Sequence, residues 1–206
     1  MTALSRPEIL RLFIAVDLSS EELSPLSNLI QSLRKADVHG IRLVADQNIH
    51  LTLKFLGGTS RKQLPRLIAA LDELGTQISP FTLRLGNIGG FPNLKQSHVI
   101  WIGLADMAQS VTVLAHFIED ACESIGFRRE TQPFIPHLTV ARMSAAASPK
   151  DRKKASETLL SLQWEPNISI PIFSISLIES TLTPQGPIYK SLHTIPLSLS
   201  PNTPLS

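Results

Sequence analysis

The sequence predicts an α+β fold of two pseudo-symmetric lobes around a central cleft. The tripeptide His-Leu-Thr occurs twice, at residues 50–52 and 137–139, each time inside a short apolar run. The expected order of elements around the two copies is the same, namely strand, helix, His-Leu-Thr strand, helix and strand. Motifs at matching positions of two repeated halves would meet where the halves face each other. We therefore expect a single bilobal domain, residues 1–196, built from an internal duplication.

The composition is that of a globular domain. Of the 206 residues, 43% are hydrophobic and 17% are charged, which argues against disorder. Nineteen basic and seventeen acidic residues give a formal charge of +2, which is too balanced for a protein that coats nucleic acid. An anionic ligand therefore has to be met by a local group of side chains.

No segment of the sequence is typical of a membrane span or a signal peptide. The first apolar run is interrupted by Arg11 and closed by Asp17, and no stretch reaches the roughly 18 apolar residues of a membrane helix. The single cysteine, Cys122, excludes an internal disulfide, favours a reducing compartment and is expected to serve packing. We expect a cytoplasmic protein without membrane contact.

The first strand and helix have clear sequence signals. The run from Leu10 to Leu18 is compact, apolar and bounded by polar residues, which favours a buried strand. Ser19 and Glu22 form a capping-box pattern, and apolar residues follow at helical spacing up to Leu33. Pro25 lies early enough to be tolerated in or near the first turn of this helix.

The rest of the first half alternates strand and helix signals. Pro65 is expected to delay the start of the second helix, because proline fits only the first helical turn. In chain order we expect a strand at 41–44, the first motif strand up to Gly57-Gly58, a helix that begins near Ser60 and Gln63 and carries Leu64 to Leu74, an alternating strand at 81–88 and a turn at 89–92.

The second half repeats this order of elements. In chain order we expect a strand from His98 to Leu104, a helix with one apolar face from Val111 to Ile125, the strand PHLTVAR, a helix capped by Ser148 with Pro149 at its first position and running to about Leu162, and strands at 170–179 and 188–196. Residues 197–206 lack apolar periodicity, so we expect a disordered tail there.

Each His-Leu-Thr motif places a histidine and a threonine on one side of its strand. Residues two apart on a strand point to the same face, so His50 shares a face with Thr52 while the leucine between them packs into the core. His137 and Thr139 repeat this arrangement in the second half. The two motifs are therefore expected to present two imidazoles and two hydroxyls to the cleft.

Two basic residues extend the motif strands. Lys54 continues the face of His50 and would add positive charge there. Arg142 has the opposite parity from His137, so it reaches the cleft only if its strand ends or bulges before it.

Two histidines and two threonines that converge in this way suit the hydrolysis of a phosphoester. One imidazole can take a proton from water while the other gives a proton to the leaving oxygen, and the hydroxyls can donate to phosphate oxygens. Histidine suits both proton roles because its unperturbed pKa of about 6.5 lets neutral and protonated copies coexist near neutrality. This chemistry needs no metal, and we expect a bell-shaped pH profile set by the coupled pair.

Packing is the alternative explanation for each candidate residue. A histidine in an apolar strand is more often a packed, hydrogen-bonded residue than a catalyst, but two copies at matching points of a repeat are hard to explain by packing. No cysteine and histidine group has zinc-ligand spacing and no glycine-rich phosphate loop is present, so neither a metal nor another cofactor is implied. His39, His116 and His193 lack a motif, residues 150–154 are typical of a solvated helix face, and Phe55, Phe91 and Phe134 are expected in the core rather than stacked on a base.

The chain resembles the two-histidine phosphoesterase superfamily, which is named for a repeated histidine-x-threonine or histidine-x-serine (HxTx) motif. Within it, the chain is most similar to the bacterial and archaeal RNA 2',3'-cyclic phosphodiesterases, also called 2'-5' RNA ligases. The likeness runs from about Arg11 to Pro196, in the segments RLFIAVDL, NIHLTLKFLG, GGFPN, VIWIGL, PFIPHLTVAR and LIESTLTPQGPIY. It implies the LigT-like fold, in which each lobe is an antiparallel sheet with helices packed outside.

The resemblance implies that the protein hydrolyses a terminal 2',3'-cyclic phosphate of RNA to a 2'-phosphate, as a step in RNA processing. His50 and His137 would be catalytic, and Thr52 and Thr139 would hold phosphate oxygens. His137 is assigned as the base that activates water and His50 as the acid that protonates the departing 3'-oxygen, with the reverse assignment left open. The family also implies a capacity for reversible 2'-5' ligation of RNA.

Two arginines match the family pattern and two positions depart from it. Arg42 and Arg142 would bind substrate, because a guanidinium can bind a phosphate through two donors; the alternative is a surface ion pair. The family often has tryptophan where this chain has Leu43, and arginine where it has His98. Both departures leave the histidines intact but would weaken base stacking or phosphate contacts beyond the reacting nucleotide.

Two other functions are compatible with the same residues. A related enzyme acting on a small cyclic nucleotide or a 2'-5' oligoadenylate would prefer that substrate over RNA ends. A non-catalytic RNA-end binder would hold cyclic-phosphate ends without turnover, although retention of both histidines and both threonines argues against it. The expected partners are RNA ends or nucleoside 2',3'-cyclic phosphates, bound by a monomer.

Overall fold

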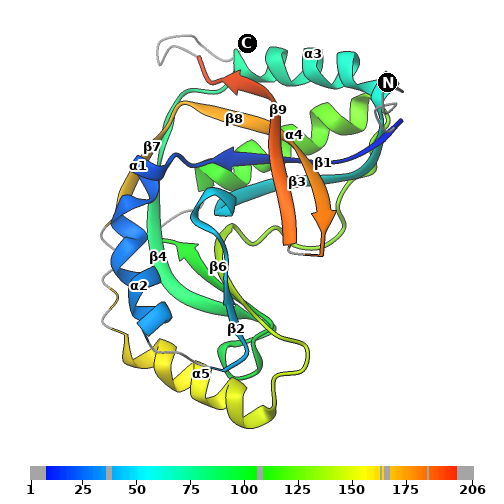
Figure 1. Ribbon diagram of the computed structural model, residues 1–206. Coiled ribbons are helices and arrows are strands. Elements are labelled where there is room, and N and C mark those ends of the chain that lie inside the picture. The colour runs from blue at the N-terminus through cyan, green and yellow to red at the C-terminus, as the bar shows by residue number, and fades with distance from the viewer. Residues whose placement is uncertain are drawn as a thin grey trace, which may run out of the picture.

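The computed structural model describes residues 8–35, 39–105, 109–162, 164, 168–184 and 186–198 (Figure 1). The elements follow in the order β1 (Ile9–Asp17), α1 (Ser20–Leu23), α2 (Ser27–Lys35), β2 (Ile41–Leu43), β3 (His50–Ser60), α3 (Leu64–Gly75), β4 (Phe81–Phe91), β5 (Val99–Leu104), α4 (Gln109–Ser124), β6 (His137–Met143), α5 (Pro149–Ser161), β7 (Ser169–Ile172), β8 (Ser174–Thr183) and β9 (Gly186–Pro196).

The strands of the described chain form one curled antiparallel sheet in the order β7-β4-β5-β6-β3-β1-β8-β9, with β2 paired to β6. In Figure 1, β1, β3, β8 and β9 form an upper lobe, and β2, β4, β5 and β6 form a lower lobe with β7 along the edge of β4. The lobes join where β3 meets β6, at the cross-strand pair Leu51 and Leu138, both fully buried. The predicted α+β fold of two antiparallel lobes is confirmed.

The two lobes are not the two halves of the sequence. β8, near the end of the chain, pairs with β1 near its beginning, and β4 of the first half pairs with β5 of the second. The helices cross over too, because α4 packs on β3 and α2 packs on β2. This exchange closes the second edge of β1, which would otherwise present unpaired backbone groups.

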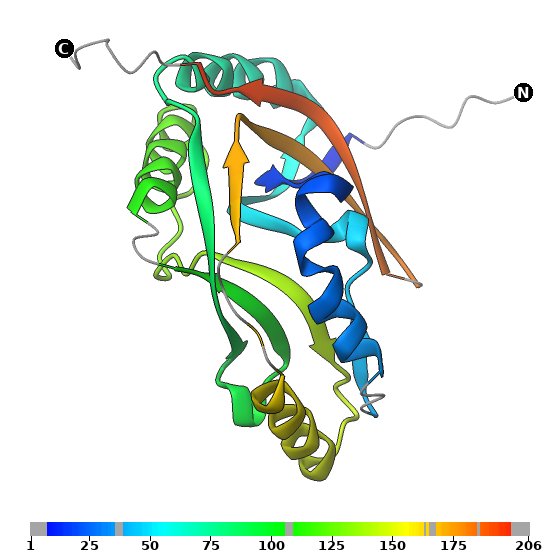
Figure 2. The ribbon, with the colours of Figure 1, turned by 90° about the vertical axis from the view of Figure 1, so that its left-hand side faces the viewer.

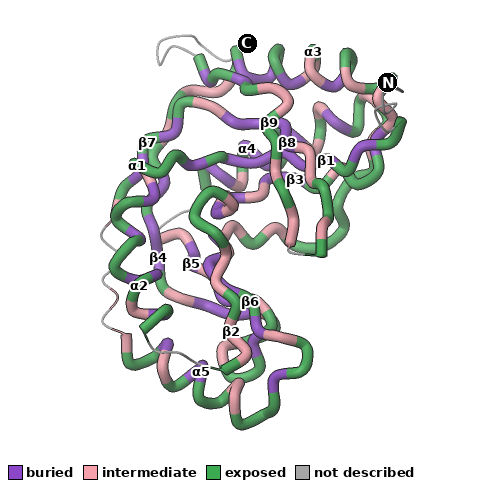
Figure 3. The backbone as a smooth tube through the Cα atoms, viewed as in Figure 1, coloured by how far each residue is buried: buried purple, intermediate pink, exposed green. Residues whose placement is uncertain are grey.

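Helices cover the outer faces of the sheet (Figure 2). α3 and α4 pack against each other and on the upper lobe, whereas α2 and α5 lie against the lower lobe. Alternate residues of β1 from Leu10 to Val16 belong to the main hydrophobic core between the sheet and the helices. Figure 3 shows β1 buried over much of its length. Cys122 on α4 lies in the same core, where burial raises the pKa of its thiol to about 11, so packing is its role.

None of the described helices combines the length and the apolar character that a membrane span requires.

The structure confirms the helix starts that the capping and proline patterns predicted. Ser19 and Glu22 form the predicted capping box, and Pro25 lies in a 3-10 turn, Ser24–Leu26, that separates α1 from α2. A second capping box at Ser60 opens another 3-10 turn, so that Pro65 does delay the start of the following helix. The helix after Ser148 begins with proline as predicted.

Two expected elements differ from the structure. The strand expected at 170–179 is two strands, β7 and β8, which separate at Phe173 and pair with different parts of the sheet. Both are apolar, so hydrophobic pattern alone does not reveal the break. The turn expected at 89–92 begins only after Phe91, because Gly89 and Gly90 continue β4.

The described structure extends two residues past the expected domain end at 196. Leu197 is 5% exposed and belongs to the main core, and its N–H donates to the backbone oxygen of Phe173. Ser198 donates in the same way to Gly75. The rest of the expected tail, 199–206, lies outside the described residues.

Candidate active site

A cleft of about 880 Å³ lies where the two lobes join. Both motif histidines line it, because His50 is the first residue of β3 and His137 is the first residue of β6. The antiparallel pairing of the two motif leucines sets each histidine across from the threonine of the other motif, on the face opposite the core. Thr52 and Thr139 also line the cleft, so the structure brings together the four motif residues.

The two imidazoles are held by equivalent hydrogen bonds. Nδ1 of His50 lies 2.8 Å from the backbone oxygen of Asn48, and Nδ1 of His137 lies 2.7 Å from that of Ile135. A carbonyl oxygen can only accept, so Nδ1 carries the proton in both rings and Nε2 is left for proton transfer. Nε2 of His50 lies 3.1 Å from Oγ1 of Thr52, as expected for a histidine and a threonine on one face.

Aromatic side chains from two other strands enclose the His50 ring. Its centroid lies 4.9 Å from that of Phe13 on β1 and 5.1 Å from that of Tyr189 on β9, with an edge-on contact to the tyrosine. Nδ2 of Asn48 donates to the backbone oxygen of Pro187, which ties the β8–β9 hairpin to the residues before β3. The orientation of His50 therefore depends on strands far apart in the sequence.

The His137 ring has its own aromatic neighbours in the lower lobe. Its centroid lies 5.0 Å from that of Phe91, edge-on, and 6.0 Å from that of Trp101. The Trp101 ring lies so close over Gly89 that a Cβ at this position would overlap it. The glycine thus allows the tryptophan to pack beside His137.

Burial lowers the pKa of both histidines. For His50, desolvation is the largest cause; the hydrogen bond to Asn48 raises the pKa, and the charges of His137 and Arg142 lower it further. For His137, desolvation also leads, the hydrogen bond to Ile135 opposes it, and Arg142 adds to the lowering. Because the charge of one histidine acts on the other, the two titrate as a pair.

A β-bulge at Leu53 changes which side chains of β3 face the cleft. Leu53 has no partner on β1, since the residues on either side of it pair with the consecutive residues Ile14 and Ala15. Alternation shifts by one residue, and Phe55 rather than Lys54 turns to the cleft, with 67% of its surface exposed. The prediction that Phe55 lies in the core is therefore wrong. The sequence pattern gives no sign of the bulge that turns this side chain outward.

The same bulge turns Lys54 away from the face of β3 that carries His50. Its side chain is 2% exposed, and its Nζ binds Oε2 of Glu119 on α4 at 2.6 Å and the backbone oxygen of Arg128 at 2.9 Å. The expectation that Lys54 adds positive charge beside His50 is therefore wrong.

A second bulge, at Val140 of β6, brings Arg142 to the cleft. Val140 has no partner on β5, because its neighbours pair with the consecutive residues Ile100 and Trp101. Arg142 was expected to reach the cleft only if its strand ends or bulges before it, and this bulge meets that condition. Arg142 lines the cleft directly across from Arg42 of β2. Like charges that face each other across a strand pair are destabilising, so this pairing favours an anionic ligand.

The cleft carries positive charge with no acidic side chain among its described lining residues. Arg11 of β1 joins Arg42 and Arg142 there, and none of the three forms an ion pair within the described ranges. The surface ion pairs that were the alternative for Arg42 and Arg142 are absent from this part of the chain. A phosphate is the anion that such a group of guanidinium ions binds well.

The remaining candidates lie in other places. Leu43 lines the cleft, so its departure from the family pattern falls in the cleft wall, whereas Nδ1 of His98 lies outside the lining, 3.3 Å from Nη1 of Arg152. His193 binds Asp72 at 2.7 Å. Phe134 packs on the main core as predicted. None of His39, His98, His116 and His193 lines the cleft.

Sequence reasoning missed several residues that line the cleft or hold its histidines. Each of them lies in one of the segments that carry the family resemblance, which is the signal that would have found them. They are Arg11, Phe13, Asn48, Phe55 and Tyr189.

Comparison with known proteins agrees with this geometry. The family model described as LigT like Phosphoesterase matches residues 16–101 and again residues 102–189, so the protein belongs to this family. Each matched segment contains one of the two motifs.

Relatives and solved structures match over most of the chain. A protein from Archaeoglobus fulgidus named RNA 2',3'-cyclic phosphodiesterase is 32% identical over 183 residues, which cover 89% of this chain and 98% of that protein. A crystal structure from Thermus thermophilus superposes with a TM-score of 0.76 at 28% identity, and E. coli LigT complexed with 3'-AMP superposes with 0.68 at 27% identity. Both superpositions cover 92% of this chain and 99% of the other.

Proposed function

We propose that the protein hydrolyses the terminal 2',3'-cyclic phosphate of RNA to a 2'-phosphate, by metal-independent acid–base catalysis with His50 and His137. The observation that carries the proposal is the pair of histidines in a cleft with three arginines. In each histidine Nδ1 is bound to a backbone oxygen, so that Nε2 is the nitrogen that can transfer a proton. The name of the relative from Archaeoglobus fulgidus supports this substrate class.

Two proton transfers complete the reaction. Nε2 of neutral His137 takes a proton from water while the water oxygen attacks phosphorus. The bond between phosphorus and the 3'-oxygen breaks, and His50, protonated on both nitrogens, gives its Nε2 proton to that oxygen. His137 then releases its extra proton to solvent and His50 takes one up from solvent, which restores both rings. The products are a 2'-phosphate and a 3'-hydroxyl.

The other cleft residues bind the phosphate. Thr52 and Thr139 donate hydrogen bonds to the non-bridging oxygens, and Arg42 and Arg142 balance their charge. If the 5'-hydroxyl of a second RNA takes the place of water, the same displacement forms a 2'-5' bond, which accounts for a capacity for ligation.

The first test is phosphorus NMR of adenosine 2',3'-cyclic phosphate with the protein in EDTA, with His137→Ala and His50→Ala in parallel. We expect the parent to form the 2'-phosphate and each variant to lose about a hundred- to ten-thousand-fold in rate, the usual contribution of one proton-transfer group. Equal turnover by all three proteins would contradict the mechanism. Tight binding of cyclic-phosphate ends without turnover would instead establish an RNA-end binder.

The roles of the two histidines can be separated with a substrate that has sulfur in place of the 3'-oxygen. A thiolate leaves without being protonated, so we expect His50→Ala to regain most of its lost rate on this substrate and His137→Ala to stay impaired. Recovery by His137→Ala instead would reverse the assignment.

The natural substrate and the state of the protein complete the proposal. A higher kcat/KM for short RNAs with cyclic-phosphate ends than for small cyclic nucleotides or 2'-5' oligoadenylates would support RNA as the substrate. We also propose a cytoplasmic monomer, which light scattering and cell fractionation can check.

A further inference from the structure

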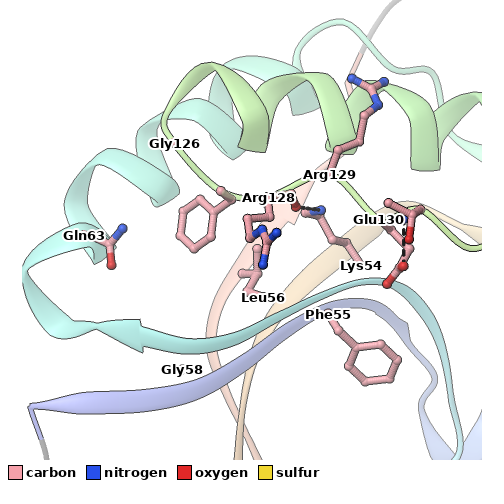
Figure 4. A pocket seen from close by; sticks show the side chains of 11 residues that line it. Lys54, Phe55, Leu56, Gly58, Gln63, Gly126, Arg128, Arg129 and Glu130 are labelled. Carbon is pink, nitrogen blue, oxygen red and sulfur yellow. Dashed lines mark hydrogen bonds between the residues drawn. The ribbon is translucent and has the colours of Figure 1, made fainter.

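A second hollow, of about 550 Å³, adjoins the catalytic cleft (Figure 4). It lies between the second half of β3, the residues before α3 and the segment that follows α4. Phe55 and Gly58 line both the hollow and the cleft, so the two spaces share this part of β3 as a wall. The volume suits a ligand of the size of one nucleotide.

Arg128 is the cation that faces this hollow without a carboxylate partner in the described residues. Lys54 is bound to Glu119, and the neighbouring Arg129 is bound to both Asp120 and Glu123. In Figure 4 the Arg128 side chain lies over Leu56 within the hollow, whereas Arg129 points away from it. The backbone of Arg128 is held in place because its oxygen accepts from Nζ of Lys54.

The acidic side chain at the rim of the hollow is already satisfied. Oε1 of Glu130 accepts from the backbone N–H groups of Thr131 and Gln132, and these bonds are the main reason why its pKa is lowered. The guanidinium of Arg128 is therefore left to bind an anion from outside the protein.

Phe55 supplies an aromatic surface at the boundary between the two spaces. It is 67% exposed, and its ring lies 6.1 Å from that of Phe13 in the catalytic cleft. An exposed aromatic ring beside a cationic groove is the usual platform for an unpaired base.

We propose that this hollow binds the nucleotide that precedes the cyclic-phosphate end of an RNA, with Arg128 at its phosphate and Phe55 against its base. The inference rests on the proposed function. A cyclic phosphate closes the 3' end, so the rest of the RNA must leave the cleft through the 5'-oxygen of the terminal nucleoside. The next group along that path is a negatively charged phosphodiester followed by another base, and the hollow offers a cation and a stacking surface for them.

The test compares two substrates, adenosine 2',3'-cyclic phosphate and the dinucleotide ApA with a 2',3'-cyclic phosphate end. The readout is the ratio of kcat/KM for the dinucleotide to that for the mononucleotide, which cancels effects on the chemical step. We expect the parent to prefer the dinucleotide and Arg128→Gln to lower the ratio about tenfold, as for the loss of one charge-assisted contact to phosphate.

Arg129→Gln is the matched control. It also removes one positive charge, at the neighbouring position, but from an arginine that is already paired with Asp120 and Glu123. We expect it to keep the parent ratio. A parent ratio near one, an unchanged ratio in Arg128→Gln, or an equal fall in both variants would overturn the inference while leaving the proposed function in place. A parent that turns over neither substrate would overturn both.

Discussion

We expect the protonation states of the two cleft histidines to govern how activity depends on pH. The proposed reaction needs one neutral and one protonated imidazole, and burial lowers both pKa values from the ordinary value of 6.5. The singly protonated pair is therefore most populated below pH 6.5. As pH rises through the lowered pKa values, the acid loses its proton, so kcat/KM falls on the alkaline side earlier than for a free histidine.

Removal of Arg142 tests this electrostatic account. Its charge lowers the pKa of both His50 and His137, so Arg142→Gln is expected to raise both and to move the pH maximum of kcat/KM to higher pH. The measurement is a pH–rate profile on adenosine 2',3'-cyclic phosphate. The control is Arg42→Gln, which removes the arginine opposite on β2 and is not among the causes of either shift. A maximum that stays in place in Arg142→Gln would contradict the account.

At the level of elements, two bulges shape the two strands that carry the His-Leu-Thr motifs. Each follows directly after a His-Leu-Thr motif, at Leu53 and at Val140, and each shifts the alternation of the residues that follow. As a result Phe55 and Arg142, each five residues beyond its histidine, both reach the cleft. The two repeats thus share the position of the histidine and of the bulge. They differ in the side chain that the bulge turns to the cleft, which is the aromatic Phe55 in β3 and the cationic Arg142 in β6.

The bulge in β3 also buries an ion pair, which makes a prediction about stability. Lys54→Met leaves the carboxylate of Glu119 without its buried partner, so we expect it to lower the free energy of unfolding by about 3 kcal/mol. The double variant Lys54→Met/Glu119→Leu removes both charges and is expected to regain most of this loss. Urea denaturation measures both. If the single variant is as stable as the parent, the pair does not hold β3 against α4.

The packing of Trp101 on β5 over Gly89 on β4 leads to a prediction about catalysis. Gly89→Ala would displace the Trp101 ring, which is a neighbour of His137, so we expect kcat to fall at least tenfold with KM little changed. Trp101→Phe is the matched rescue, because the smaller ring leaves room for the new methyl group and Nε1 of Trp101 has no hydrogen-bond partner in the described structure. The double variant should recover most of kcat. If it stays as slow as Gly89→Ala alone, displacement of the ring is not the cause.

At the level of the whole molecule, the site exists only where the two lobes meet. His50 belongs to the upper lobe and His137 to the lower, and β8 and β9 from the end of the chain complete the lobe that holds His50. The last described residues hold this assembly together, since Leu197 is buried and hydrogen-bonded to Phe173 in the turn between β7 and β8.

Two truncations locate the end of the folded domain. A chain ending at residue 198 should match the full-length protein in stability, as the predicted disordered tail requires. A chain ending at 196 loses the buried Leu197 and its backbone hydrogen bond, so its free energy of unfolding should fall by about 2 kcal/mol. Denaturation of the three proteins side by side measures this. Equal stability of the two truncations would place the end of the domain at 196, as the sequence predicted.

The sequence by itself determined the features that depend on local pattern. Hydrophobic periodicity and capping boxes gave most helices and strands, and two His-Leu-Thr copies in matching contexts predicted the four residues that meet in the cleft. Strand alternation also predicted that Arg142 would reach the site only if its strand ended or bulged before it. These predictions succeed because side-chain direction within a strand or helix is set by neighbours along the chain.

Only the tertiary structure decided the features that depend on partners distant in sequence. A bulge exists only relative to a paired strand, so the exposure of Phe55 and the burial of Lys54 could not be predicted from alternation. The aromatic neighbours of His50 come from β1 and β9, and the exchange of strands between lobes depends on which edges need a partner. The motifs thus identify the two histidines that meet in the cleft, while long-range strand pairing sets their surroundings and hence their pKa values.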